Sequence, residues 1–292
     1  MIANLLIKNH KIDEERALKM GCAVAGVFNK KDGKPLASDD PEMETLFFAA
    51  PSQIEAFADL AFKEWGENKV ISANKSALRK SCNEVGCYDA ADIALFGRMV
   101  AAESDLTMEG AALFSHALST HKADNETDYF SAVDDEKKMS EDAGAAMLGV
   151  LEFSSAVYYR YAGINLDLLF DQSNGHLKKC DIDQRMAIVK AFIHSTLLSI
   201  PTARKNSMNG DNPPAYVLGI CKEVGQPVQL INAFEKPVRA PFDGGFIERS
   251  VALLNEHYIS LKKTWNIQTV DEVSIPDVGI DEFCNRLTAY VK

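Results

Sequence analysis

The chain has 292 residues, of which 47% are hydrophobic, so it can bury a substantial core as one large or two ordinary globular domains. Its formal net charge of −11 argues against nonspecific binding of nucleic acid by the whole surface, but it allows a local basic groove. No apolar run reaches the roughly 18 residues of a membrane helix. Residues 1–10 also lack the features of a secretory signal, so we expect a cytoplasmic protein with no membrane partner.

The six cysteines are scattered along the chain, which predicts free thiols. The closest pair, Cys82 and Cys87, has no second pair and no histidine cluster to complete a zinc site. We therefore expect no structural metal and no cofactor.

The N-terminal third of the chain is expected to be mainly helical. Apolar residues recur at helical spacing over residues 14–28 and again over 54–65. Ser52 followed by Glu55 matches a capping box, which would start the second of these helices. Gly97 is a poor residue for a helix interior, so it predicts a break or a close approach of two segments.

Beyond residue 110 the pattern changes to a mixture of strands and helices. Because the two alternate only loosely, the pattern favours an α+β protein over a doubly wound parallel sheet. We therefore divide the chain into a helical region, 1–110, and a mixed region, 111–292. Strands are expected over 111–120, 151–162, 216–220 and 228–234, and helices over 183–198, 246–261 and 280–291.

A long polar arm, residues 121–149, interrupts the mixed region. It is acidic and punctuated by Gly and Ala, and an aromatic and β-branched strand follows it. Connections longer than about 12–15 residues are uncommon in compact domains and are often functional. The arm is therefore either a functional element or a solvated surface loop.

Motifs of catalysis are scarce. The chain contains no G-x-S-x-G, no P-loop and no G-x-G-x-x-G. His116, His121, Asp134 and Asp135 could form a hydrolase metal site, but the histidines are five residues apart, which suits neither one helix face nor one strand face. The alternative is a structural histidine beside a solvated acidic arm, and we expect no catalytic residue.

Small basic islands occur near the ends of the expected elements. Exposed pairs of Lys and Arg are commonplace, but together these islands could line a groove that follows the phosphates of a single strand. The islands are Lys75, Arg79 and Lys80; Arg98; Arg204 and Lys205; and Lys236 and Arg239.

Six short blocks follow one another from about Asp92 to Arg239, roughly half of the chain. They are DIALFGRM (92–99), HALSTH (116–121), DYFSAVDD (128–135), EFSSAVYYRYA (152–162) with Asn165 and Leu166, Asn212-Pro213, and NAFEKPV (232–238). In this order they resemble the crRNA-binding backbone subunit (CasC) of the type I-E CRISPR Cascade complex.

The resemblance implies a hand-shaped α+β protein. Its palm would be a modified RRM-like, or ferredoxin-like, sheet, its fingers the helical region 1–110, and its thumb a β-hairpin arm over 121–150. Copies of such a subunit stack head-to-tail along the spacer of a CRISPR RNA. The implied partners are CRISPR RNA, target DNA through the guide, further copies of the chain and other Cascade subunits.

The resemblance also implies which residues meet RNA. It places Phe130, Ser131 and Val133 at a wedge that separates bases, and it places basic residues beside RNA-facing blocks. Tyr129, Phe130 and Val133 have no core within the arm, so they pack on the palm, on a neighbouring subunit or on bases. The expected RNA-binding residues are Arg98, Met99, Phe130, Ser131, Val133, Arg204, Lys205, Lys236 and Arg239.

The sequence departs from the family pattern in one respect, and two alternative functions stay open. Members of the family begin with a strand, an Asn-Arg-Asp-Asp-like segment and a basic Ser-Ser-Gln-x-Leu-Lys-Arg block, none of which is present, so the chain is expected to lack that N-terminal segment. The first alternative function is a metal-dependent ribonuclease that uses Asp134 or Asp135 with His121. The second is an α+β domain that binds a small molecule and carries a long loop.

Overall fold

The computed structural model forms two compact units. The first comprises Met1–Leu113, Ala162–Thr196 and Thr288–Lys292, and the second comprises Phe114–Tyr161 and Leu197–Leu287. The assignment of residues 1–110 to the fingers and of residues 111–292 to the palm and thumb stays a prediction. The structure describes residues 1–29, 36–37, 41–66, 71, 74–86, 88–100, 103–132, 147–172, 175–201, 206, 209–239 and 244–292.

Helices surround the first of two cores in the first unit. They are α1 (Ile2–His10), α2 (Glu14–Asn29), α3 (Pro51–Trp65) and α4 (Lys75–Val85). The predicted apolar face of residues 14–28 is confirmed, because Ala17, Met20, Val24 and Phe28 are all buried. The same core takes in Phe57 of α3, which is 2% exposed.

The start of α3 differs from the prediction. Pro51 is its first residue, a position that suits proline because the missing N–H would have no helical partner. Ser52 is not the cap: its backbone N–H and its hydroxyl both donate to the Asp89 carboxylate, at 2.8 and 2.6 Å. The Gln53 side-chain oxygen accepts the Ala50 N–H instead, at 3.1 Å.

The second core of the first unit gathers residues from both ends of that unit. Leu95, Leu169, Phe170 and Phe192 are buried in it. The predicted break at Gly97 is confirmed, because a Cβ there would lie 2.8 Å from the Met108 carbonyl oxygen. The elements are α5 (Ala91–Phe96), η1 (Ser104–Leu106), β1 (Ala112–Phe114) paired with β6 (Ala162–Ile164), α6 (Leu166–Phe170) and α7 (Ile182–Leu198).

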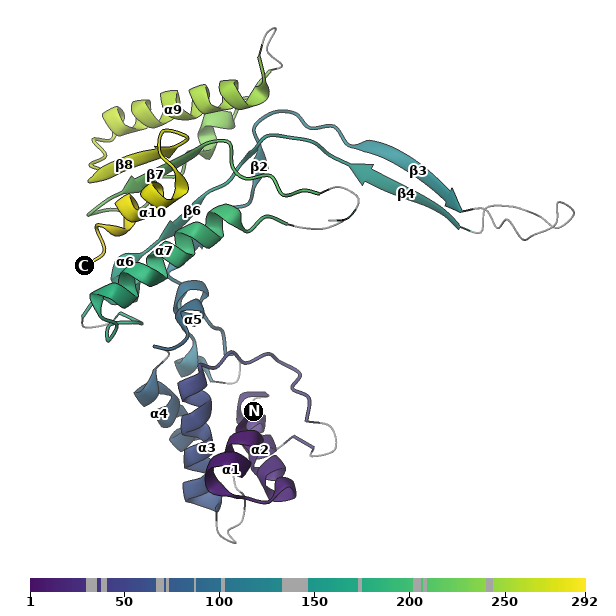
Figure 1. Cartoon of the computed structure of the whole chain (residues 1–292), viewed down its shortest axis with the longest axis vertical. Helices are drawn as coiled ribbons and strands as arrows, with labels where there is room; N and C mark the ends of the chain where they lie inside the picture. Colours follow the sequence, from purple (N-terminus) through teal and green to yellow (C-terminus); the bar gives the residue numbers. More distant parts are fainter. Residues whose placement is uncertain are drawn as a thin grey trace, which may run out of the picture. The chain divides into compact units, whose positions relative to one another are not determined.

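A two-stranded sheet between two helices forms part of the second unit (Figure 1). Strands β7 (Val217–Cys221) and β8 (Asp271–Ile275) are antiparallel, with Gly219 opposite Val273. Helix α10 (Ile280–Thr288) packs so closely on one face that a Cβ at Gly219 would lie 2.7 Å from Phe283 Cζ. Helix α9 (Phe246–Thr264) reaches the sheet through Tyr258, whose hydroxyl donates to Glu272 at 2.8 Å.

The arm is a β-hairpin over its described part. Strands β3 (Glu126–Ala132) and β4 (Met147–Phe153) are antiparallel, and Figure 1 shows them running outward from the other strands of the second unit. Residues 133–146, between them, lie outside the described residues. An isolated two-stranded hairpin is only marginally stable in water, so its direction depends on how it is held at its root.

Several predicted elements differ from those observed. Residues 228–234 are not a strand, because Ile231–Phe234 form the 3-10 helix η2. The strand expected over 151–162 is divided among the end of β4, β5 (Tyr158–Tyr159) and the start of β6. From the 111–120 segment only β1 and β2 (Leu118–Ser119) form, and β8 was not predicted.

At a coarse level the α+β prediction is confirmed. In the described part of the chain the strands pair into four two-stranded sheets, of which β2–β5, β3–β4 and β7–β8 are antiparallel. The RRM-like arrangement stays a prediction. None of the helices that the structure describes has the length and apolar character needed to cross a membrane.

Candidate nucleic-acid interface

The hairpin carries large apolar side chains that are exposed. Cross-strand partners share a face of an antiparallel pair, so Tyr129 and Val150 lie on one face and Phe130 and Gly149 on the other. Tyr129 is 69% exposed, Val150 53% and Phe130 40%. These side chains have too little hairpin around them to form a core, which makes them available for a partner.

Acidic residues accompany the apolar ones. Glu126 and Asp128 of β3 are exposed, and Asp124 forms an exposed ion pair with Lys122 at 2.8 Å. Such a pair contributes little stability in water. The acids near the hairpin root would repel phosphates, so an RNA-binding hairpin would present its aromatic side chains to the bases.

Two exposed basic residues flank the hairpin root. Lys236 and Arg239 are exposed, whereas Val238 between them is 5% exposed and donates its N–H to the Thr120 carbonyl at 2.9 Å. Within the described residues, neither Lys236 nor Arg239 has an ion-pair partner. We name residues 236–239 the basic segment.

The basic segment is held from its N-terminal side by Tyr159 of β5. The Tyr159 hydroxyl donates to Gln229 and accepts the Leu230 N–H, and its ring lies 5.7 Å from the ring of Phe234 in η2. Burial raises the pKa of the Tyr159 hydroxyl, so it stays a neutral donor. The segment that precedes Lys236 is therefore fixed by contacts within the second unit.

His121 has the structural role that was the alternative to a metal site. Its Nε2 accepts the Val157 N–H at 3.1 Å, which leaves the proton on Nδ1, 2.8 Å from the Lys122 carbonyl. Both ring nitrogens are thus used internally. Asp134 and Asp135 lie outside the described residues. Within the described part of the chain, no group of three or more His, Cys, Asp or Glu side chains could hold a metal ion.

Arg98 lies in the first unit and is 5% exposed. Its guanidinium donates to the carbonyls of Leu106 and Phe48, at 3.1 and 2.9 Å, and to the side-chain oxygen of Gln53 at 2.9 Å. The neighbouring Met99 is 81% exposed. RNA binding by either residue stays a prediction, and the described contacts give Arg98 internal partners.

Of the other predicted RNA-binding residues, only Ser131 lies within the described part of the chain. Val133, Arg204 and Lys205 lie outside the described residues. The backbone of Ser131 pairs with Leu148 in the hairpin. The structure thus brings Phe130, Lys236 and Arg239 into the second unit and places Arg98 and Met99 in the first.

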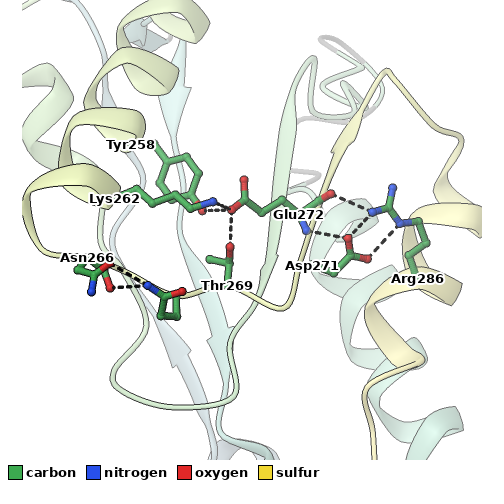
Figure 2. A network of polar contacts seen from close by, with 8 residues as sticks. Tyr258, Lys262, Asn266, Thr269, Asp271, Glu272 and Arg286 are labelled. Carbon is green, nitrogen blue, oxygen red and sulfur yellow. Dashed lines mark hydrogen bonds and ion pairs between the residues drawn. The ribbon is translucent and has the colours of Figure 1, made fainter.

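A polar network in the second unit was not predicted from the sequence (Figure 2). The Glu272 carboxylate accepts hydrogen bonds from Tyr258, Lys262 and Thr269, and Asp271 pairs with Arg286. Burial would raise the pKa of Glu272, but its three donors outweigh it and lower the pKa. The Arg286 hydrogen bonds lower the pKa of Asp271. Through these hydrogen bonds and ion pairs the network joins α9, β8 and α10.

Comparison with known proteins gives a family and a fold. The model of the CT1975-like protein family, Cas_CT1975, matches residues 1–280, which extends well beyond the six blocks recognised in the sequence. A chain of a CRISPR RNA-guided surveillance complex, pre-nicking, is similar over 100% of this chain and 82% of its own, with 22% identity and a TM-score of 0.75.

A chain of another CRISPR RNA-guided surveillance complex is similar over 68% of this chain and 78% of its own, with 24% identity and a TM-score of 0.55. Among curated proteins, no sequence match was found.

Proposed function

The chain belongs to the CT1975-like protein family, and we propose that it is the RNA-binding backbone subunit of a CRISPR RNA-guided surveillance complex. The fold that it shares over its full length with a chain of such a complex supports the proposal. The observation that carries it is the presence, in one unit, of an exposed aromatic hairpin and a basic segment that has no ion-pair partner among the described residues. We further propose that the subunit is of the type I-E Cascade class.

The chemistry of the two features suits a guide of any sequence. Lys236 and Arg239 would hold phosphates, which are the same at every nucleotide. Phe130, with Ser131 and Val133, would stand between bases, and stacking on an aromatic ring is sequence-tolerant, at about 1–3 kcal/mol per base. The Watson–Crick edges of the other nucleotides would stay free to pair with target DNA.

Assembly follows from the need to cover a long RNA. Further copies of the chain would stack head-to-tail, because a heterologous contact that does not close produces an open helical array. In this proposal residues 111–292 contain the RRM-like palm with the hairpin thumb inserted over 121–150, and residues 1–110 contain the fingers. Arg204 and Lys205 would contact RNA or a neighbouring subunit, and filament formation by Lys205→Glu would argue against both.

We propose a scaffold without catalytic activity. The ribonuclease alternative would require His121 to release an internal hydrogen bond before it could bind a metal or move a proton. Incubating the assembled protein with labelled complementary RNA and Mg²⁺ distinguishes the two functions. Intact RNA is the expected result, and regularly spaced cuts would favour the ribonuclease.

The basic segment provides the direct test of RNA binding. The Lys236→Ala, Arg239→Ala double variant should bind every single-stranded RNA more weakly. Two lost phosphate contacts should reduce the slope of log K against log salt by about 1.4. A matched control, Lys8→Ala with Lys263→Ala, removes two other exposed positive charges. Equal salt slopes for the two variants would refute the assignment.

A further inference from the structure

Thr120 joins three separate segments of the second unit. Its N–H donates to the Val157 carbonyl at 2.8 Å, and its carbonyl accepts the Val238 N–H at 2.9 Å. Its hydroxyl lies 2.8 Å from the hydroxyl of Ser250 in α9, and Thr120 and Ser250 are 2% and 5% exposed. The chain before the hairpin, the chain after it and the basic segment therefore meet at one residue.

The ring of His121 adds further contacts, and we name Thr120, His121 and the groups that they contact the joint. Besides accepting the Val157 N–H, the His121 ring stacks on the ring of Phe246, the first residue of α9, with centroids 3.9 Å apart and planes 17° apart. The Ser250 hydroxyl, which contacts Thr120, also donates to the Phe246 carbonyl at 2.7 Å. His121 is 8% exposed, so water competes little for its acceptor nitrogen.

The joint lies between the two features that the proposed function assigns to RNA. His121 precedes β3, Val157 follows β4, and Val238 lies inside the basic segment. The hydrogen bonds of Thr120 and His121 therefore fix the chain on both sides of the hairpin against the basic segment. The Asn125 side chain also donates to the Glu152 carboxylate across the hairpin root, but at 3.5 Å and in an exposed position, whereas His121 is 8% exposed.

We infer that His121 is a positioning residue whose Nε2 acceptor couples the hairpin to the basic segment, so that phosphate contacts and base contacts on one RNA are made as a unit. This inference rests on the proposed function. The Val157 N–H is the group that His121 holds, and the Phe246 stack keeps the ring in the plane that this hydrogen bond requires.

A double-mutant cycle measures this coupling. RNA affinity is determined for Arg239→Ala, for Phe130→Ala and for the pair, using the full chain and an unstructured single-stranded RNA. If the two features act as a unit, each single loss already weakens the other contact. The double variant should then lose at least about threefold less affinity than the product of the two single losses.

The cycle is repeated in two backgrounds that separate the acceptor from the ring. His121→Phe keeps a flat ring beside Phe246 but removes the acceptor, so the losses should become multiplicative. His121→Gln loses the ring but can present an amide oxygen to the Val157 N–H, so coupling should return. If His121→Phe does not fold, His121→Ala takes its place, because water can then reach the Val157 N–H.

Three results would overturn the inference: multiplicative losses in the wild-type background, unchanged coupling in His121→Phe, or no recovery of coupling in His121→Gln. Hydrogen exchange of the free protein distinguishes a failure of this inference from a failure of the proposed function. If neither single variant changes RNA binding, the proposed function fails. Fast exchange of the Val157 amide in His121→Phe and slow exchange in His121→Gln would still identify His121 as the residue that holds the hairpin root.

Discussion

The ring of Phe130 lies across its cross-strand neighbour Gly149, so that a Cβ at position 149 would come within 2.2 Å of Phe130 Cζ. The absence of a side chain at Gly149 therefore determines where the ring lies. Cζ is the far end of a side chain that can rotate, and Phe130 is 40% exposed, so a displaced ring has somewhere to go.

Gly149→Ala should displace the Phe130 ring at little cost in stability. We expect the unfolding midpoint of the hairpin variant to stay close to that of the wild type, because an exposed ring can move without leaving a cavity. Periodic base flipping on a bound RNA, detected by chemical probing, should weaken. Gly210→Ala is the control, since the nearest atom to its Cβ would be 3.8 Å away. Unaltered probing in Gly149→Ala would show that the ring position is unimportant.

Removing the apolar wedge should separate binding from base flipping. In Phe130→Ala with Val133→Ala, Lys236 and Arg239 can still contact phosphates, so RNA should still bind, though more weakly, while periodic flipping fades. The stacking lost is about 1–3 kcal/mol per base. Thermal stability of the free protein checks the opposite assignment. A large loss of stability with unchanged probing would mean that Phe130 anchors the arm to its own unit.

Arg98→Met should destabilise the first unit and thereby distinguish structural from RNA-binding roles. It leaves the Leu106 and Phe48 carbonyls without the guanidinium donor, and the Gln53 side-chain oxygen keeps only the Ala50 N–H. Each unsatisfied buried group costs about 1–3 kcal/mol, and denaturant unfolding measures the sum. Arg79→Met, at a 39%-exposed arginine, is the control. A variant of normal stability that binds RNA less tightly would instead support the predicted phosphate contact.

The Asp271–Arg286 and Glu272–Lys262 pairs should make the second unit sensitive to acid. Both carboxylates have pKa values lowered by their donors, so their contribution to the free energy of unfolding is fully present above the ordinary carboxyl pKa, about 4. That contribution is lost as the pH falls through the lower folded-state pKa values. Asp271→Asn should flatten this acid limb in unfolding measurements from pH 2 to 6. Asp59→Asn, on α3 in the first unit, is the matched control, and an equal change in both variants would contradict the prediction.

The local sequence was sufficient to predict those features that depend on the regular spacing of apolar residues or on the conformational freedom of a glycine. The buried face of α2, the extent of α7 and α9 and the break at Gly97 all followed from apolar spacing and from glycine's conformational freedom. Prediction failed at η2 and β8. Residues 231–234 are held in a 3-10 turn beside Tyr159, and β8 exists because it pairs with β7 and accepts hydrogen bonds from α9, relationships that a local pattern does not contain.

Side-chain roles at the candidate site were decided by tertiary structure. The sequence identified Phe130 as a candidate because it is a large apolar residue in a polar arm. It identified Lys236 and Arg239 because they lie in or beside a block that resembles the family's RNA-facing segments. It could not distinguish a metal-binding His121 from a structural one, because the deciding donor, Val157, is 36 residues away. Arg98 likewise has a charge that predicts phosphate binding, whereas its burial and its acceptors 45 and 50 residues away follow from the fold and not from the local sequence. A charge or a lone pair is a property of the residue, whereas its partner is a property of the fold.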